Sequence, residues 1–258
     1  MVEMNLKLSS ELSERYKSAS QIARVQTEQW AASNLYCPSC ESEEVKGTLA
    51  NTRAIDFTCP ECDHSFQLKS SRKLNEAKVV DAGYEAMVAA IRSDIRPSLF
   101  VLHYTPNLSV KNLLLVPRIF LTESAIQKRK PLGEHARRAG WVGCNILLSE
   151  IPTDGKIWLI RDGKETDRSE VRKQFGRIRP LGDLDVRLRG WILDVLKIVR
   201  RLNQKTFCLR DVYALESELA RLYPGNRNVR PKIRQQLQVL RDIGLLEFAA
   251  RGHYTIIS

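Results

Sequence analysis

The chain has 258 residues, a hydrophobic fraction of 43% and a formal net charge of +11 at pH 7. This length allows one large domain or two smaller ones, and the hydrophobic fraction argues against an intrinsically disordered protein. No apolar run approaches the roughly 18 residues of a membrane span, and the polar start "MVEMNLKLSSELSERY" lacks the apolar core of a secretory signal. We therefore expect a cytoplasmic protein that is not membrane-bound. Its positive charge favours a polyanionic partner, above all nucleic acid.

Helical and strand-like segments are mixed in the first two thirds of the chain. Apolar residues at helical spacing predict one or two helices in residues 8–32, and residues 36–70 are strand-like and rich in cysteine. The segment "DAGYEAMVAAIRSD" predicts a helix with Asp81 as its N-cap. Four apolar segments, "SLFVLHYT", "NLLLVPRIFL", "CNILLSEIP" and "GKIWLIRDG", are typical of buried strands. These segments predict a mixed α/β domain that ends near residue 180.

The remaining residues predict a second domain of a different kind. The segment "RPLGDLDVRLRG" (179–190) is the best candidate for a linker, because it combines Pro and Gly with alternating charges. After it the sequence predicts a helix, a short strand, two helices and a hairpin, which is the order of a winged helix-turn-helix. Residues 181–258 hold 14 Lys and Arg against 8 Asp and Glu, a net charge of +6. We expect an α/β domain over residues 1–182 and a DNA-binding domain over residues 183–258.

Two C-x-x-C pairs form the clearest metal-binding pattern. Cys37 with Cys40 and Cys59 with Cys62 are separated by 18 residues, which matches the spacing of structural zinc sites. Four thiolates complete a tetrahedron with no open position, so we expect a structural, non-catalytic Zn²⁺. The alternative is redox-active pairs or buried free thiols, but a redox motif needs only one pair.

A cluster of polar residues surrounds the second cysteine pair. Gln67 and Lys69 alternate along a predicted strand and share one face of it, while Asp56 lies on the preceding strand. The Asp56 carboxylate and the Gln67 amide oxygen are suited to hold Mg²⁺, with Lys69 orienting water or offsetting negative charge. The pattern resembles the PD-(D/E)xK nuclease motif, with Gln where a carboxylate is usual. The alternative is a solvated strand face. Glu28, in the N-terminal helix, is a candidate for a further acidic ligand.

Two basic segments predict contacts with DNA. The segment "NRNVRPKIRQQLQVLRD" has an apolar stripe at helical spacing and no acid between residues 226 and 241. Arg and Gln make bidentate bonds to bases, and Arg also binds phosphate. The predicted contacts on this helix are Arg230, Lys232, Arg234, Gln235, Gln236 and Arg241. In "ARRAGWVGCN", Arg137 and Arg138 precede Trp141, which we expect either to contact a base or its methyl group, or to anchor the loop in the core.

Eight segments resemble the methyl-directed restriction endonucleases of the DpnI type over nearly the whole chain. They are "SASQIARVQTEQW", "YCPSC", "DFTCPEC", "FQLKSS", "DAGYEAM", "RKPLGEHARRAGWVGCNI", "RGW" at 189–191 and "KIRQQLQVLRD". The resemblance implies a restriction-endonuclease-like mixed sheet with an inserted zinc ribbon, followed by a winged helix. It also implies a monomeric type II enzyme that cleaves double-stranded DNA at GATC sites containing N6-methyladenine, with Mg²⁺ as cofactor.

The resemblance also assigns roles to individual positions. Asp56 and Lys69 match the catalytic Asp and Lys of the family, whereas Gln67 falls where the family has Glu. Trp141 matches the Trp of the catalytic-domain loop, and residues 232–241 match the recognition helix. The alternative function is a non-cleaving zinc-ribbon and winged-helix DNA-binding regulator, which the uncharged Gln67 leaves open.

Overall fold

The computed structural model describes residues 3–11, 16–49 and 54–257 of the chain. Its contacts divide the chain into two compact units, each built from separate stretches. The first unit consists of Met1–Val80, Ser93–Arg118 and Asp154–Gly176. The second unit consists of Asp81–Arg92, Ile119–Thr153 and Arg177–Ser258. The domain boundary near residue 182 stays a prediction, because these units interleave along the chain instead of meeting at one point.

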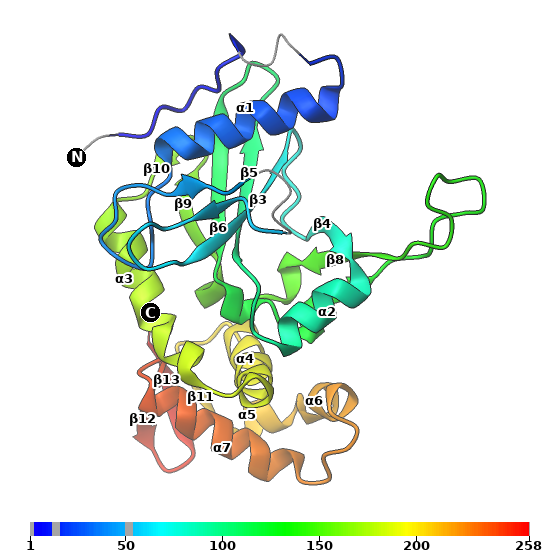
Figure 1. Ribbon diagram of the computed structural model, residues 1–258. Helices are drawn as coiled ribbons and strands as arrows, with labels where there is room; N and C mark the ends of the chain where they lie inside the picture. Colours follow the sequence, from blue (N-terminus) through cyan, green and yellow to red (C-terminus); the bar gives the residue numbers. More distant parts are fainter. Residues whose placement is uncertain (1–2, 12–15, 50–53, 258) are drawn as a thin grey trace. The chain divides into compact units, whose positions relative to one another are not determined.

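A seven-stranded sheet is the frame of the first unit, with strand order β1-β2-β3-β5-β6-β9-β10 (Figure 1). Its strands are β1 (Lys46–Gly47), β2 (Phe57–Thr58), β3 (Ser65–Ser71), β5 (Ser98–Tyr104), β6 (Val110–Val116), β9 (Ile157–Arg161) and β10 (Lys164–Glu165). The pair β3–β5 is parallel, and the other neighbours run antiparallel. Two helices accompany the sheet, α1 (Ala19–Asn34) and α3 (Arg168–Ile178). The mixed α/β class predicted from the sequence is confirmed.

One face of this sheet carries the core of the unit. Phe66 of β3 stacks on Phe100 of β5 with ring centroids 5.0 Å apart, and both side chains are fully buried. Helix α1 contacts β3 through the hydroxyl groups of Thr27 and Ser70, whose oxygens are 3.2 Å apart. Because alternate residues of a strand share a face, Ser70 lies on the same side of β3 as Phe66, and α1 contacts that side.

The other face of β3 and β5 carries a group of half-buried residues beside the buried Leu99. Gln67, Lys69, Val101 and His103 are all half-buried, whereas Leu102, between two of them, is fully buried. Lys69 is in register with Val101, so the four residues lie on one side of the sheet. We call these four positions the open face.

The second unit contains two three-stranded sheets and most of the helices (Figure 1). In the sheet of order β4-β8-β7, β4 (Lys78–Gly83) leads into α2 (Tyr84–Arg92), and β7 (Ile126–Lys128) pairs with β8 (Gly143–Leu147). The C-terminal elements are α4 (Val186–Arg201), β11 (Thr206–Cys208), α5 (Leu209–Tyr213), α6 (Glu216–Leu222), α7 (Val229–Asp242), β12 (Leu246–Ala250) and β13 (His253–Ile256). They form the predicted winged helix-turn-helix, with the sheet order β11-β13-β12. Gly252 turns the hairpin at a φ of +74°, a conformation that favours glycine.

Five predicted elements differ from the structure, and one of them is the strand predicted over "CNILLSEIP", which ends at Leu147 and is followed by a 3-10 helix. Asp81 is not an N-cap, because β4 continues to Gly83 and α2 begins only at Tyr84. The strand predicted over residues 112–121 ends at Val116, since the following Pro117 has no N–H for a strand ladder.

The C-terminal half accounts for the other two differences. The predicted linker is a 3-10 helix (Arg179–Asp183) followed by the start of α4, which Asp185 caps by accepting the N–H of Arg187 at 2.9 Å. The helix predicted over residues 210–223 is divided into α5 and α6 after Tyr213. Among the described residues, no helix combines the length and the apolar composition that crossing a membrane requires.

Candidate functional site

The four cysteines of the two C-x-x-C pairs come together in the first unit. Their sulfur atoms all lie within 4.8 Å of one another. The sulfur of Cys37 is 3.6 Å from that of Cys62, and the sulfur of Cys40 is 3.5 Å from that of Cys59. A Zn–S bond of about 2.3 Å implies tetrahedron edges of about 3.8 Å, so the cluster has the size to hold one zinc ion. The predicted closeness of the four thiols is confirmed.

The surrounding backbone favours negative charge on the sulfur atoms. The N–H of Ser39 donates to the sulfur of Cys37 at 3.4 Å, and the N–H of Glu61 donates to that of Cys59 at 3.4 Å. Burial raises the pKa of Cys37. Burial also opposes the thiolate of Cys59, but the N–H groups of Cys62 and Glu61 outweigh it and lower the pKa of Cys59 to about 7. Zinc binds thiolates, so this donor set fits the ion.

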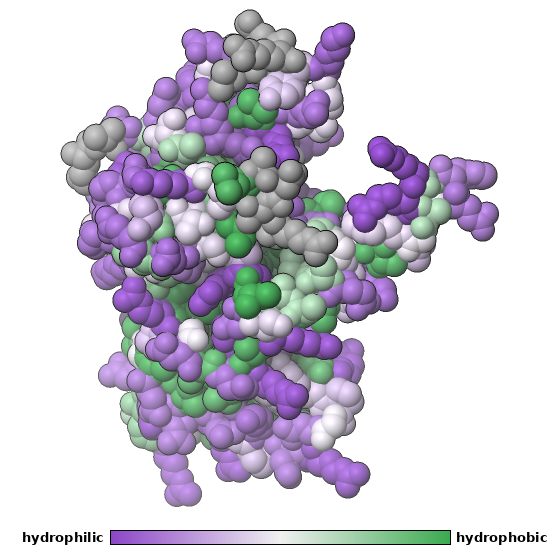
Figure 2. All heavy atoms as spheres, in the orientation of Figure 1, coloured by the Kyte–Doolittle hydropathy of each residue, from purple (hydrophilic) through white to green (hydrophobic). Residues whose placement is uncertain are grey.

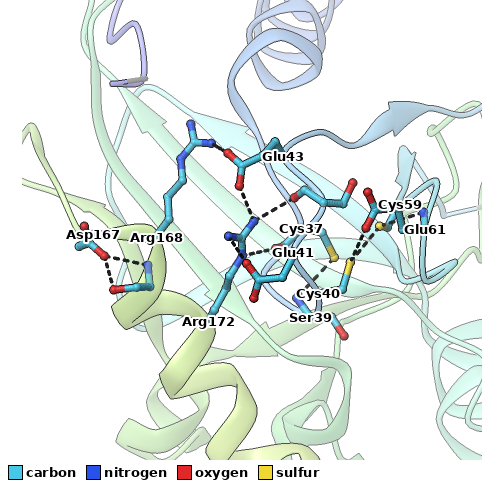
Figure 3. A network of polar contacts seen from close by, with 12 residues as sticks. Cys37, Ser39, Cys40, Glu41, Glu43, Cys59, Glu61, Asp167, Arg168 and Arg172 are labelled. Carbon is cyan, nitrogen blue, oxygen red and sulfur yellow. Dashed lines mark hydrogen bonds and ion pairs between the residues drawn. The ribbon is translucent and has the colours of Figure 1, made fainter. Parts of the chain in front are cut away.

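An arginine of helix α3 holds the first cysteine loop in place (Figure 3). The guanidinium of Arg172 donates to the carbonyl oxygens of Cys37 at 3.3 Å and Ser42 at 3.1 Å. It also pairs with the carboxylates of Glu41 at 2.9 Å and Glu43 at 2.8 Å. Only 15% of the Arg172 side chain is exposed. Arg172 therefore ties the loop to α3 through backbone and side-chain acceptors at once.

A second arginine, one turn earlier on α3, reinforces this contact. Arg168 pairs with Glu43, and its guanidinium lies 4.7 Å from the centre of the Tyr36 ring. The Arg172 guanidinium lies 5.4 Å from the same ring. Our sequence analysis did not single out these two arginines. Their spacing of four residues was the available signal, because residues four apart share one face if the segment is helical.

The polar residues around the second cysteine pair are also brought together. The antiparallel ladder of β2 and β3 pairs Phe57 with Phe66, and the backbone N–H of Asp56 also donates to the carbonyl oxygen of Phe66 at 2.9 Å. The carboxylate of Asp56 accepts the backbone N–H of Leu68 at 2.7 Å. Leu68 separates Gln67 from Lys69, so the Asp56 carboxylate lies against the backbone between these two residues.

Helix α1 brings a second carboxylate into this neighbourhood. Arg24 pairs with Glu28 at 2.7 Å, and 34% of the Glu28 side chain is exposed. The pKa of Arg24 is raised, chiefly by the hydrogen bond and charge of Glu28 and to a smaller extent by the charge of Asp56. Arg24 thus interacts with both carboxylates, and Glu28 stays a predicted further ligand.

The segment between β7 and β8 forms an arm in the second unit (Figure 1). Its two sides are joined by backbone bonds, including Leu132 N–H to Trp141 oxygen at 2.9 Å. Arg137 and Arg138 are exposed on it, and hydrophilic residues cover most of its surface (Figure 2). Trp141 is half-buried, with the Arg138 guanidinium 4.8 Å from its ring centre. A side chain at Gly143 would come within 2.9 Å of the indole, so the ring lies directly against this glycine.

Helix α7 presents most of the residues predicted to contact DNA. Arg234, Gln235 and Arg241 are exposed, and Lys232 is half-buried with its ammonium 2.9 Å from the Gln235 oxygen. Arg230 is exposed and pairs with Glu216 of α6 at 2.6 Å, so its guanidinium is engaged within the unit.

Gln236 does not share this surface. Its side chain is fully buried, beside the apolar residues Ile233, Leu237 and Leu240, which are also fully buried. A side chain in that position faces the core of the unit and not solvent. We therefore remove Gln236 from the predicted DNA contacts.

Two protein-family models match the chain. The DpnI model, described as the Dam-replacing family, matches residues 4–183. The DpnI_C model, described as the Dam-replacing HTH domain, matches residues 187–256. The second match begins one residue after the start of α4 and includes every later helix and strand that the structure describes.

Proposed function

Because the chain belongs to the DpnI family, the Dam-replacing family of restriction nucleases, we propose that it cleaves methylated double-stranded DNA. Membership in this family implies a restriction nuclease with a DNA-binding helix-turn-helix domain. To this we add a type II, methyl-directed reaction with Mg²⁺ as cofactor and GATC sites containing N6-methyladenine as substrate. We further propose that the protein acts as a monomer in the cytoplasm and carries one structural Zn²⁺ on its four clustered cysteines.

The observation that carries this proposal is the hydrogen bond from Leu68 N–H to the Asp56 carboxylate. It brings the Asp56 carboxylate to the backbone between Gln67 and Lys69, which supports our proposal that an acid, an amide oxygen and an amine act together. We assign Asp56 and Gln67 as ligands of Mg²⁺, with Glu28 as a further candidate. When bound there, Mg²⁺ supplies Lewis-acid polarisation of the phosphate and a more acidic water. Lys69 offsets the negative charge that develops on the phosphate during hydrolysis.

Two basic surfaces of the second unit support recognition of DNA. On α7, the exposed Arg234, Gln235 and Arg241 suit base edges and phosphates in a major groove. On the arm, the half-buried Trp141 offers apolar surface beside the exposed Arg138. Burying one methyl-sized group contributes about 0.8 kcal/mol, which is only a few-fold in affinity. Strong methyl preference therefore requires several contacts, and a palindromic site with two methyl groups provides them.

The decisive experiment compares the wild-type protein with Asp56→Asn on adenine-methylated and unmethylated plasmid. We expect Mg²⁺-dependent cleavage of the methylated plasmid by the wild type. Asp56→Asn should retain binding of the methylated duplex and lose cleavage, because the amide carries no charge for the metal. Equal cleavage of both plasmids by the wild type would refute the methyl-directed reaction.

The same experiment tests the non-cleaving regulator. The feature that favours this second candidate is Gln67, which places no negative charge where the family has Glu. Specific binding of methylated DNA by the wild type, with no nicking at any Mg²⁺ concentration, would establish the regulator and exclude the nuclease.

A further inference from the structure

The tautomer of a histidine on the open face is fixed by the hydrogen bonds of its neighbours. His103 lies on β5 and faces Asn112 of β6 across the antiparallel ladder. The Nδ1 atom of His103 is 3.0 Å from the Nδ2 atom of Asn112. On its other side, Asn112 accepts the backbone N–H of Asp162 through Oδ1 at 2.9 Å. Asn112 is buried, whereas His103 is half-buried.

These contacts determine which ring nitrogen carries the proton. A backbone N–H can only donate, so the bond from Asp162 identifies Oδ1 of Asn112 as the atom that faces it. The amide nitrogen of Asn112 therefore faces His103, and because it can only donate, Nδ1 of His103 must accept. The N–H of the neutral imidazole is then at Nε2, the outer edge of the ring.

The position of His103 on the sheet links this donor to the proposed nuclease site. The parallel register sets Ser71 beside His103 and Lys69 beside Val101. With strands about 4.8 Å apart and a rise of about 3.3 Å per residue, the Cα atoms of Lys69 and His103 are roughly 8 Å apart. Successive phosphates of one DNA strand advance by about 3.4 Å along the helix axis, so a strand that reaches Lys69 carries a neighbouring phosphate within range.

We propose that His103 is a phosphate-positioning residue, whose neutral Nε2–H donates to a backbone phosphate beside the one that is cleaved. This inference rests on the proposed nuclease function and deepens it. His103 does not act on the reacting phosphate. It fixes the register of the strand relative to Asp56 and Lys69, and Asn112 keeps its donor directed outward. Since phosphate contacts carry no sequence information, the contribution of His103 is the same for methylated and unmethylated DNA.

Two substitutions of His103 distinguish the role of Nδ1 from the role of Nε2. His103→Asn keeps a polar group near the position of Nδ1 and removes the outer donor, whereas His103→Gln keeps a donor near the position of Nε2. We expect His103→Asn to weaken duplex binding roughly three- to tenfold, the range of one neutral hydrogen bond. His103→Gln should recover most of this loss. Binding is measured by titration with Ca²⁺ in place of Mg²⁺, on methylated and unmethylated duplexes of the same sequence.

The salt dependence of binding tests whether the donor is neutral, whereas recovery by His103→Gln is the readout that a purely structural role would not give. A neutral donor releases no counterion, so the slope of log K against log salt should stay at the wild-type value in His103→Asn. Arg234→Gln is the cationic reference, and it should reduce the slope by about 0.9. Thermal unfolding of each variant shows whether the fold is retained.

The outcomes distinguish this inference from the proposed function. If the wild type neither binds nor cleaves methylated DNA, the proposed function fails and the inference fails with it. If the wild type cleaves and Arg234→Gln lowers the slope, but His103→Asn binds as well as the wild type, only the role of His103 is overturned. A smaller slope of log K against log salt in His103→Asn would refute the claim that His103 donates as a neutral imidazole. Equal losses in both His103 variants, with lower unfolding temperatures, would assign His103 to folding alone.

Discussion

Arg172→Met tests whether helix α3 secures the proposed zinc loop. The substitution keeps an apolar stem against Tyr36 and removes every hydrogen bond that the guanidinium donates. The carbonyl oxygen of Cys37, a residue that is 0% exposed, then loses its donor, whereas the carbonyl oxygen of Ser42 keeps the N–H of Cys37 at 3.0 Å. An unsatisfied buried acceptor costs about 1–3 kcal/mol, whereas each exposed ion pair contributes about 0–1 kcal/mol. We therefore expect the free energy of unfolding to fall by about 1–4 kcal/mol, from one unsatisfied carbonyl and two exposed ion pairs.

Two measurements on zinc-loaded protein check this expectation. Urea unfolding should show a lower midpoint, and transfer of zinc to a colorimetric chelator should be faster, because the loop opens more often. Lys173→Met is the matched control, since it removes a cation from the same helix at a side chain that is 73% exposed. The control should stay within about 0.5 kcal/mol of the wild type. If Arg172→Met keeps the wild-type midpoint and the wild-type rate of zinc transfer, the arginine does not secure the loop.

Three further predictions concern the proposed metal ligands, the arm and a buried acid. Gln67→Glu should lower the Mg²⁺ concentration needed for half-maximal cleavage several-fold, because a carboxylate attracts the cation that an amide does not; an unchanged Mg²⁺ titration would exclude Gln67 as a ligand. Gly143→Ala should displace the indole of Trp141 and reduce the ratio of affinities for methylated and unmethylated duplex, and an unaltered ratio would separate Trp141 from methyl recognition. Asp194 is buried and accepts the hydroxyl of Tyr223 at 2.6 Å, and burial raises its pKa. The contribution of Asp194 to stability is therefore fully present below the unfolded-state pKa of about 3.9 and is lost as pH rises through the raised folded-state pKa. The difference in unfolding free energy between Asp194→Asn and the wild type should change across that pH range. A constant difference would contradict a raised pKa of Asp194 in the folded protein.

The features that were predictable from the sequence are those set by local spacing. Two C-x-x-C turns bring their thiols together wherever the chain folds, because each pair closes a short turn. Strand alternation likewise placed Gln67 and Lys69 on one face, and the order of elements after residue 183 was sufficient to identify the winged helix. Gln236 was also within reach of such reasoning, since it is three residues after Ile233 and four before Leu240 on the buried side of α7.

The features that could not be predicted depend on which distant segments pack together. Arg172 acts on a loop about 130 residues earlier in the chain, with sequence separations of 129 to 135 residues. The two compact units draw on alternating stretches, which no local pattern reports. Asp81 was assigned to a helix start because its side chain suits a cap, but the preceding strand continues past it and buries it.

The ladder between β2 and β3 consists of two residue pairs, whereas β3 is joined to β5 over six. The alignment of β2 is therefore governed less by the sheet than by the number of residues in the turn that contains Cys59 and Cys62. Inserting or deleting one residue in that turn would move Ile55 or Phe57 into the place from which Asp56 accepts the N–H of Leu68, because the register of β2 against β3 would shift by one residue. The length of the turn therefore sets the register of β2 against β3. The turn can tolerate many changes of composition, but a change of length by a single residue would replace an acid with a hydrocarbon at the position where the metal is proposed to bind.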